Sequence, residues 1–391
     1  MNTNTEFTIH SRQFTLLRFP PQGKHSSLQA WDAADEYLLN YLYDQQLLVP
    51  SRIAILNDDF GAISCPLAEF SPEVFSDSFM AHSGIKLNCE RNKLPPVNLS
   101  SSLALTEASN LVKNTYELVI IKIPRTLALL EQQLIDLRPS LSEHSTLIAA
   151  GKVNSVTSNV LKLFEKYIGE TKTSLAVKKS RLIFAQFNPN IARSSPFPSK
   201  VDDPAISFSL YNHANVFCRE QLDIGARLLL EHLPNHFKGR CIDLGCGNGV
   251  LGVAMLLRNP DTHMTFVDES FMAIASAQLT AKNALSHEAY EQQTQFEVSH
   301  CLQTLIEAKL PPVDLVLCNP PFHQQNVITD EIAWKMFVDA KRTLKVHGEL
   351  RVVANRHLNY PDKLKRLFGG CKLVANNRKF MVLSAIKLNE N

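Results

Sequence analysis

Hydrophobic and polar positions in the second half of the chain follow the short period of strands in some segments and the longer period of helices in others. Short apolar runs predict strands at residues 239–244, 262–267, 295–298, 313–318 and 349–354, and a terminal hairpin of 372–374 with 381–386. The segments between them predict helices at residues 250–258, 271–284 and about 331–344. Strands separated by helices indicate an α/β fold with a parallel, doubly wound sheet.

The connections of such a sheet decide which loops meet. Right-handed crossovers place the loop after the first strand beside the loop after the fourth, at the carboxyl edge of the sheet. The first of these loops begins at residue 245 and the other at residue 319. Because parallel sheets bind ligands at this edge, we expect the functional site there.

A glycine loop lies between the first strand and its helix. It reads Asp243-Leu244-Gly245-Cys246-Gly247-Asn248-Gly249. Glycine tolerates positive φ and has no Cβ to obstruct a ligand. A dinucleotide could use a similar loop, but the GxGxxG spacing is absent. The segment resembles the first motif of class I S-adenosylmethionine-dependent methyltransferases. That resemblance implies that the cofactor is bound by Asp243, Gly245, Cys246, Gly247, Asn248 and Gly249.

Polar residues also follow the second and third strands. Asp268 ends the second strand, and a carboxylate there can accept hydrogen bonds from both ribose hydroxyls of an adenosine. We expect the next residue, Glu269, to belong to the cofactor site as well. The alternative is a helix-capping role, which Glu269 and Ser270 could share. Ser299 follows the third strand and is expected near the adenine, although the family often has Asp or Asn there. The adjacent His300 is expected to be a surface loop residue.

The fourth strand leads into the tetrapeptide Asn319-Pro320-Pro321-Phe322. It resembles the clamp of methyltransferases that modify planar amino groups. In those enzymes the Asn side-chain carbonyl and the carbonyl of the first proline accept the two N–H groups. Consecutive prolines stiffen the turn, and Phe322 can stack on a flat target. His323 and Gln324 could contact the target, and Asp314 within the strand is expected to be structural.

The first half of the chain repeats this plan weakly. Residues 52–57, 116–125 and 145–152 match segments of the second half, with offsets that drift from about 190 to about 205 residues. In the first copy, Asn57-Asp58-Asp59-Phe60-Gly61 replaces the glycine loop and Ile123-Pro124-Arg125 replaces the clamp. We interpret the chain as a duplicated domain whose first copy has lost cofactor binding and catalysis. The alternative is an unrelated α/β domain with fortuitous matches.

The length of 391 residues is about twice that of an ordinary single domain. Prolines and serines between residues 189 and 204 mark a linker. We therefore expect a degenerate methyltransferase-like domain that binds RNA at residues 1–188, a linker at 189–204 and a catalytic domain at 205–391.

Composition adds few constraints. The chain is 45% hydrophobic and 20% charged, has a net charge of +2, and contains no apolar window long enough for a membrane span and no signal-peptide pattern. Its eight cysteines form no CxxC pair, so we expect reduced thiols in the cytoplasm. Basic residues cluster at 178–181, 341–342 and 363–366, and would form a phosphate-binding footprint if they lay on one surface.

A resemblance that covers more of the chain narrows the expected substrate of the methyl transfer. Residues 208–233, 319–323 and 348–355 resemble bacterial ribosomal RNA guanine-N2 methyltransferases, which also carry a degenerate domain before the active one. Two related families act on the two ribosomal subunits. Residues 28–39 and 319–325 are more similar to the 23S ribosomal RNA (guanine-N2)-methyltransferase G family than to the guanine-N2 methyltransferase C family, which acts on 16S ribosomal RNA. The G family modifies nucleotide 1835 of the large ribosomal RNA.

The resemblance implies two tandem Rossmann-like domains and methyl transfer from S-adenosyl-L-methionine to guanine N2, with S-adenosyl-L-homocysteine as product. It implies 23S ribosomal RNA or a large-subunit assembly intermediate as partner. We expect neither a metal ion nor a membrane partner. The alternatives are a 16S ribosomal RNA guanine-N2 methyltransferase, a protein glutamine N5-methyltransferase and, in another class, a non-catalytic RNA-binding assembly factor.

Overall fold

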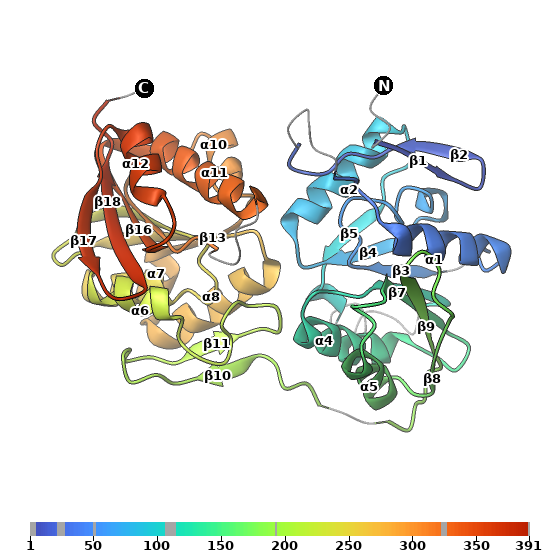
Figure 1. Cartoon of the computed structure of the whole chain (residues 1–391). Coiled ribbons are helices and arrows are strands. Elements are labelled where there is room, and N and C mark those ends of the chain that lie inside the picture. The colour runs from blue at the N-terminus through green and yellow to red at the C-terminus, as the bar shows by residue number, and fades with distance from the viewer. Residues whose placement is uncertain are drawn as a thin grey trace. The chain divides into compact units, whose positions relative to one another are not determined.

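The computed structural model describes residues 5–21, 28–49, 52–105, 115–191, 194–321 and 327–389, without the side chains of residues 327–329. The chain divides into two compact units, Met1–Pro196 and Phe197–Asn391. Each unit has its own sheet of seven strands, and Figure 1 shows the two sheets. Each unit also has its own hydrophobic cores. Within the described residues, no helix is long and apolar enough to cross a membrane.

The sheet of the second unit has the strand order β14-β13-β12-β15-β16-β18-β17. Its strands are β12 (Gly239–Leu244), β13 (Thr262–Asp268), β14 (Thr294–Val298), β15 (Val313–Cys318), β16 (Leu344–Asn355), β17 (Lys372–Asn376) and β18 (Phe380–Ile386). The pairs from β14 to β16 are parallel, whereas β18 runs antiparallel to both β16 and β17. The predicted parallel sheet and terminal hairpin are confirmed.

Helices cover both faces of this sheet (Figure 1). They are α6 (Ile224–Glu231), α7 (Val250–Arg258), α8 (Phe271–Ala284), α9 (His287–Gln293), α10 (Gln303–Glu307), α11 (Val327–Thr343) and α12 (Tyr360–Phe368). Buried side chains of α6, α7 and α8 belong to one core, and those of α10, α11 and α12 to the other. Successive residues of β15 alternate between the two cores, because neighbouring side chains of a strand point to opposite faces.

Four helices of the second unit were not predicted: α6, α9, α10 and α12. The signal for α12 was present, since Tyr360, Leu364 and Phe368 are buried at a spacing of four residues on an otherwise polar segment. Helices α9 and α10 are short, with seven and five residues, so little periodicity is available to reveal them.

The sheet of the first unit has the order β5-β4-β3-β6-β7-β9-β8, which is element by element the order of the second unit. Its strands are β3 (Ile53–Leu56), β4 (Glu73–Ser76), β5 (Asn98–Ser101), β6 (Leu118–Lys122), β7 (Thr146–Lys152), β8 (Thr171–Thr173) and β9 (Ser180–Ala185). Its α-helices are α1 (Ala33–Asp44), α2 (Phe79–Arg91), α4 (Leu127–Leu137) and α5 (Ser158–Tyr167). The repeated architecture that the sequence predicted is confirmed.

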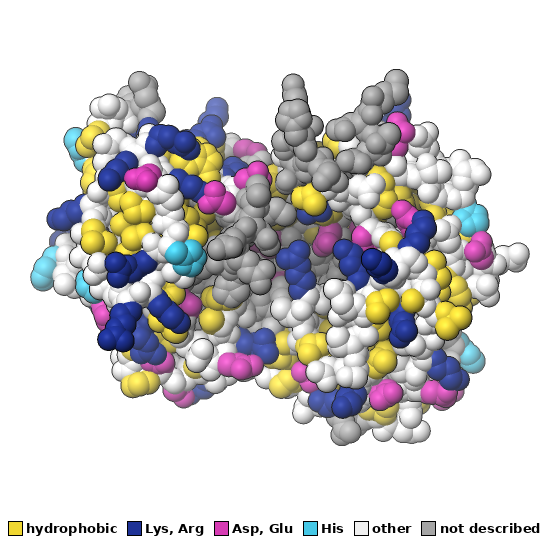
Figure 2. Space-filling view, in the orientation of Figure 1, with side chains coloured by type: hydrophobic (Ala, Val, Ile, Leu, Met, Phe, Trp, Pro, Cys, Tyr) yellow, Lys and Arg dark blue, Asp and Glu magenta, His cyan; other side chains and the backbone are white. Residues whose placement is uncertain are grey.

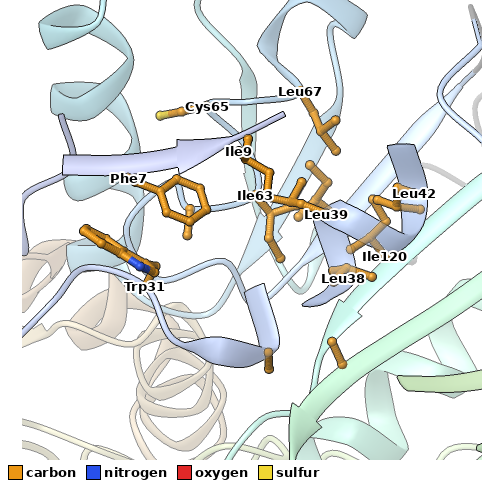
Figure 3. Packing of buried hydrophobic residues seen from close by; sticks show 14 of the residues in the cluster. Phe7, Ile9, Trp31, Leu38, Leu39, Leu42, Ile63, Cys65, Leu67 and Ile120 are labelled. Atoms are coloured by element: carbon orange, nitrogen blue, oxygen red, sulfur yellow. The ribbon is translucent and has the colours of Figure 1, made fainter. Parts of the chain in front are cut away.

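A hairpin of β1 (Glu6–Ile9) and β2 (Arg12–Thr15) precedes this sheet and packs into one of its cores. Phe7 and Ile9 of the hairpin lie in one buried cluster with Leu38 and Leu42 of α1 and with Ile120 of β6 (Figure 3). The cluster therefore attaches the N-terminal segment to the sheet through apolar contacts.

A second hairpin, β10 (Ser199–Val201) with β11 (Leu210–Asn212), belongs to the second unit. It is fastened to α8 because the backbone N–H groups of Tyr211 and His213 donate to the hydroxyls of Thr280 and Ser276, at 3.1 and 2.9 Å. This attachment brings Asn212 to the glycine loop.

Candidate active site

The glycine loop after β12 has a backbone that only glycine adopts easily. Gly245, Gly247 and Gly249 have φ angles of 73°, 52° and 80°, in the left-handed region. The N–H groups of Gly245 and Cys246 donate to the carbonyl of Val267 at 2.8 and 3.0 Å, which fixes the loop against β13. A Cβ on Gly247 would meet no described atom within 4 Å, so the loop leaves open space there.

Asp243 is fully buried at the end of β12. Its Oδ2 accepts a hydrogen bond from the Gly252 N–H at 2.9 Å, whereas its Oδ1 is buried without a partner among the described residues. Burial raises the pKa of this carboxyl to about 7, with a further contribution from Asp268. An unpartnered buried acceptor of this kind fits a bound cationic group.

Asp268 stands at the end of β13, where the sequence placed it. Its Oδ2 accepts from the Gly247 N–H and its Oδ1 from the Ser270 N–H, both at 3.0 Å. Burial raises the pKa of Asp268, although these backbone donors oppose the rise. Each carboxylate oxygen has a second lone pair, so these bonds leave capacity for ribose hydroxyls. The capping alternative is met by Ser270, whose hydroxyl accepts from the Ala273 N–H at 3.1 Å.

The other proposed cofactor residues make contacts within the protein. Asn248 donates from Nδ2 to Oδ1 of Asn212 at 2.9 Å, which ties the loop to β11. Burial raises the pKa of Cys246 well above the ordinary thiol value, so this side chain remains a neutral thiol. The Ser299 hydroxyl is buried and accepts from the Thr304 N–H at 3.1 Å. Glu269 lies half-buried between β13 and α8.

The expectation that His300 is a surface residue is wrong. Only 3% of its surface is exposed, and burial, helped by Lys335, lowers its pKa to about 4. The loop after β14 turns inward because Asp339 of α11 accepts the Leu302 N–H at 3.3 Å. Asp314 has the expected structural role, since it accepts from the Arg240 N–H at 2.9 Å and from the Lys345 ammonium at 2.8 Å.

Asn319 lies directly beside the glycine loop. Leu244 and Cys318 pair across β12 and β15, so both loops start at one edge of the sheet, as predicted. A Cβ on Gly245 would lie 3.9 Å from the Asn319 carbonyl oxygen. The side-chain Oδ1 of Asn319 is buried without a hydrogen-bond partner among the described residues. Pro320 is buried and Pro321 exposed, whereas Phe322, His323 and Gln324 lie outside the described residues.

One neighbour of Asn319 carried no predicted role. The Asn319 Nδ2 donates to Oδ2 of Asp223 at 3.1 Å, and Asp223 is the N-cap of α6. The sequence offered a local signal, because an Asp before the apolar run at residues 224–230 is typical of a helix start. The contact with Asn319 joins residues 96 positions apart, so no local sequence pattern could predict it.

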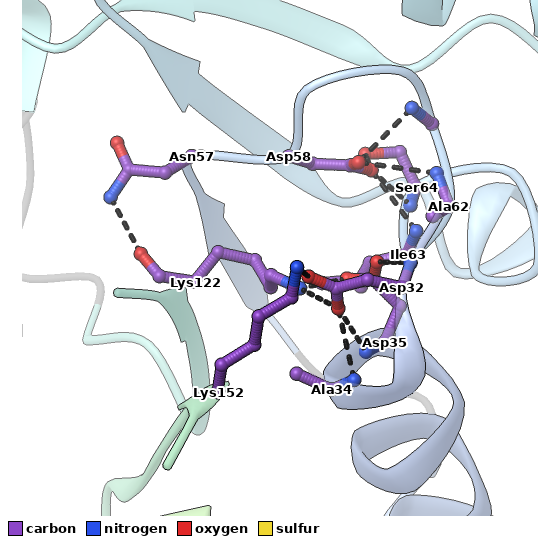
Figure 4. A network of polar contacts seen from close by, with 11 residues as sticks. Asp32, Ala34, Asp35, Asn57, Asp58, Ala62, Ile63, Ser64, Lys122 and Lys152 are labelled. Atoms are coloured by element: carbon purple, nitrogen blue, oxygen red, sulfur yellow. Dashed lines mark hydrogen bonds and ion pairs between the residues drawn. The ribbon is translucent and has the colours of Figure 1, made fainter. Parts of the chain in front are cut away.

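In the first unit, the loop after β3 is the counterpart of the glycine loop. Its backbone N–H groups bind a side chain of the same loop (Figure 4). Asp58 accepts hydrogen bonds from the N–H groups of Gly61, Ala62, Ile63 and Ser64 at 2.7 to 3.1 Å, and from the Ser64 hydroxyl at 2.7 Å. These are the backbone donors that an anionic ligand would otherwise need. Asp58 therefore supplies the hydrogen-bond acceptor for these four N–H groups, which need no ligand.

Lys122 has the position in the first unit that Asn319 has in the second. It follows Ile121, which pairs with Leu56 as Cys318 pairs with Leu244. Its ammonium lies 3.0 Å from Oδ1 of Asp32 and 2.5 Å from Oδ1 of Asp35 (Figure 4). An ammonium group only donates hydrogen bonds, so it cannot accept the N–H groups of an amine.

Several residues of the basic clusters make contacts within the protein. Lys178 pairs with Glu36 at 2.8 Å, Lys363 pairs with Asp330, and Arg366 stacks on Trp334 with 4.6 Å between the guanidinium carbon and the ring centroid. On the visible face of each unit, Lys and Arg side chains are interspersed with acidic and apolar ones (Figure 2). Among the described residues, no group of three or more His, Cys, Asp or Glu is placed to hold a metal ion.

Comparison with known proteins places the chain among methyltransferases. A protein of Pseudoalteromonas atlantica, named Ribosomal RNA large subunit methyltransferase G, is 50% identical over 387 residues, which is 98% of this chain and 99% of the relative. A protein of the same name from Photobacterium profundum is 50% identical over 97% of this chain and 99% of the relative. The solved 16S rRNA N2 methyltransferase RsmC of T. thermophilus, in complex with AdoMet and guanosine, is similar in fold. Its TM-score is 0.74, with 19% identity over 99% of this chain and 98% of that one.

The fold and the site together define a tandem pair of Rossmann-like methyltransferase units, of which the second keeps an open glycine loop beside an amide acceptor. Residues 4–189 match the family described as RLMG N-terminal domain, and residues 207–384 match Methyltransferase small domain. The chain belongs to the ribosomal RNA large subunit methyltransferase G family, and it is a methyltransferase enzyme.

Proposed function

We propose that this enzyme transfers a methyl group from S-adenosyl-L-methionine to the exocyclic N2 of a guanine in 23S ribosomal RNA, at nucleotide 1835. The shared name of the relatives supports a large-subunit ribosomal RNA substrate. The single observation that carries the proposed chemistry is the buried, unpartnered Oδ1 of Asn319 next to the glycine loop.

The target atom follows from what that acceptor can do. The amino group of guanine is a poor nucleophile because its lone pair is delocalised into the ring. Asn319 Oδ1 and the Pro320 carbonyl would accept its two N–H groups and orient the nitrogen toward the methyl donor. Phe322 would stack on the base. The neutral amine would form the N–CH3 bond as the sulfonium S–CH3 bond breaks and leaves the neutral thioether, and the methylated nitrogen would then lose one proton to water. We assign no general base, because orientation is needed before transfer and the proton leaves only afterwards.

The residues around the glycine loop fit the proposed methyl donor. Asp243 Oδ1 would accept the cofactor's amino group, and Asp268 would accept its ribose hydroxyls. The open space at Gly247 would admit the cofactor next to the backbone. Bound there, S-adenosyl-L-methionine supplies an electrophilic methyl group on its sulfonium. The proposed cofactor residues of the loop and strand ends are Asp243, Gly245, Cys246, Gly247, Asn248, Gly249, Asp268, Glu269 and Ser299.

The proposed roles of the two units differ. A guanine stacked in RNA must be unstacked or flipped to reach Asn319. The first unit, whose loop is occupied by Asp58 and whose clamp position carries Lys122, would contribute RNA backbone contacts instead of catalysis. We therefore expect one active site per chain.

The test is to map methylated guanines in 23S ribosomal RNA from a deletion strain that is complemented with the wild type or with Asn319→Ala. We expect nucleotide 1835 to be modified only with the wild type. Calorimetry with S-adenosyl-L-homocysteine should show that Asn319→Ala still binds the product, so that the loss is assigned to the clamp. Unchanged modification in both the deletion strain and the Asn319→Ala strain contradicts the proposal.

The same samples discriminate the alternatives. Loss of an N2-methylguanine from 16S instead of 23S ribosomal RNA would indicate the small-subunit reaction. Methylated glutamine in release-factor peptides after incubation with enzyme and cofactor would indicate protein methylation. Absence of any binding of S-adenosyl-L-homocysteine would indicate a non-catalytic RNA-binding factor.

A further inference from the structure

The amide of Asn319 has two chemically different ends with different surroundings. Its Nδ2 donates to Oδ2 of Asp223 at 3.1 Å, whereas its Oδ1 has no partner among the described residues. Rotation by half a turn would exchange the two ends and would present an NH2 group to the substrate. An amine clamp needs the opposite arrangement, because the substrate amine is itself a donor.

Asp223 decides between these two orientations. A carboxylate has no proton to donate, so only the NH2 end of the amide can face it. The carboxylate is itself held in place, since Oδ2 also accepts the Ala226 N–H at 2.8 Å and Oδ1 accepts the Cys218 thiol at 3.9 Å. Burial, together with Asp223, raises the pKa of Cys218 to about 11, so this residue remains a thiol that can donate.

The first unit contains the same pair of positions. Asp32 is the N-cap of α1 and accepts the Ala34 N–H at 2.9 Å, as Asp223 caps α6. Lys122, at the clamp position, donates to Oδ1 of Asp32 at 3.0 Å. Both units thus place a helix-capping Asp against a residue at the carboxyl end of the fourth strand: Lys122 is the last residue of β6, and Asn319 directly follows β15. The residue that it orients has changed from an amide to an ammonium.

We propose that Asp223 is a positioning residue, which acts through Asn319 by turning its side-chain oxygen toward the amine of the substrate. This proposal rests on the proposed function of the site. It predicts that Asp223 affects the rate of methyl transfer and leaves cofactor binding unchanged, because it contacts the clamp and not the glycine loop.

Two substitutions separate this role from helix capping. Serine and asparagine cap helices about as well as aspartate. In Asp223→Ser the side chain is one atom shorter, so it keeps the hydrogen bond that caps α6 and loses the one from Asn319. In Asp223→Asn the carbonyl oxygen reaches as far as Oδ2 and can still accept both N–H groups. We expect kcat on 23S ribosomal RNA to fall about 10- to 100-fold in Asp223→Ser and to stay within about 3-fold of wild type in Asp223→Asn. Neither should change the affinity for S-adenosyl-L-homocysteine or the melting temperature.

Two further measurements test the coupling. If Asp223 acts through Asn319, adding Asp223→Ser to Asn319→Ala should cause no further loss of rate. In protein labelled with ¹⁵N-asparagine, the side-chain amide protons of Asn319 should exchange with solvent faster in Asp223→Ser than in wild type. The exchange measurement does not depend on activity.

The outcomes distinguish this proposal from the proposed function. A wild-type enzyme that methylates no guanine in 23S ribosomal RNA overturns the function and leaves the exchange result to be judged by itself. An active wild type with equal kcat in Asp223→Ser overturns the positioning role alone. Additive losses in the double variant, or unchanged exchange of the Asn319 amide, overturn it as well.

Discussion

Asn57 and Gly245 occupy equivalent positions, directly after β3 and β12, and share a left-handed backbone with φ angles of 64° and 73°. Only Asn57 has a side chain that can fill the space beside this position, because glycine has none. The Asn57 Nδ2 donates to the carbonyl of Lys122 at 3.0 Å, and so bridges the space between the loop after β3 and the end of β6. In the second unit Gly245 leaves the same space open, with the Asn319 carbonyl oxygen on its far side. The Asn57 side chain thus fills space in the first unit that stays open beside Gly245, in addition to the backbone donors that Asp58 occupies.

The first prediction inserts that side chain into the second unit. Gly245→Asn should fold, because asparagine tolerates this φ and the nearest obstacle is the flexible end of Met336, 3.3 Å from a Cβ. We expect calorimetry to show a loss of affinity for S-adenosyl-L-homocysteine of at least about 100-fold, as the new side chain fills the cofactor space. The matched control is Asn57→Gly, which should leave affinity and activity unchanged. An unaltered affinity in Gly245→Asn would show that the cofactor binds elsewhere.

The second prediction concerns the buried carboxyl of Asp243. Its pKa rises from an ordinary value of 3.8 to about 7 because it is buried, so the folded protein holds this proton more tightly than the unfolded chain does. Stability from this group is lost as the pH rises through 7. Asp243→Asn should therefore stabilise the cofactor-free protein by about 2–4 kcal/mol at pH 8, and by much less near pH 4. Urea unfolding at both pH values measures this difference, and a gain that does not depend on pH contradicts it.

The same substitution should weaken cofactor binding. The charged carboxylate favours a cationic amino group, so wild-type affinity for S-adenosyl-L-homocysteine should rise between pH 6 and pH 8. Asp243→Asn should bind more weakly and lose this pH dependence, which calorimetry over that range would detect. A retained pH dependence would assign the titration to another group.

The third prediction tests how closely α7 packs on β13. A Cβ on Gly252 would lie 2.2 Å from Cε1 of Phe266, which is fully buried and stacked on Phe296 with 4.8 Å between ring centroids. Because the ring cannot retreat, Gly252→Ala should destabilise the protein by about 2–4 kcal/mol in thermal or urea unfolding. Gly370→Ala is the control, since a Cβ there meets no described atom within 4 Å. Equal stability of the two variants would contradict the close packing.

Much of the fold could be predicted from the sequence because its signals are local. The segment from β12 through the glycine loop to α7 was predicted with the bounds that the structure has, since an apolar run, three glycines and a helical period lie within twenty residues. The repeat of this plan in the first unit was also visible, although its loop sequence had diverged. Short helices such as α10 were missed for lack of periodicity.

For the site, the sequence and the tertiary structure contributed different information. The sequence by itself determined which residue types stand at the strand ends: an acid before a glycine loop, a second acid, and an asparagine before two prolines. Only the tertiary structure decided how they are used. It buried His300, linked Asn248 to Asn212, and placed Asp223 against the Nδ2 of Asn319. The physical reason is distance along the chain: a motif records neighbours in sequence, whereas Asp223 and Asn319 meet only after the strands between them have paired.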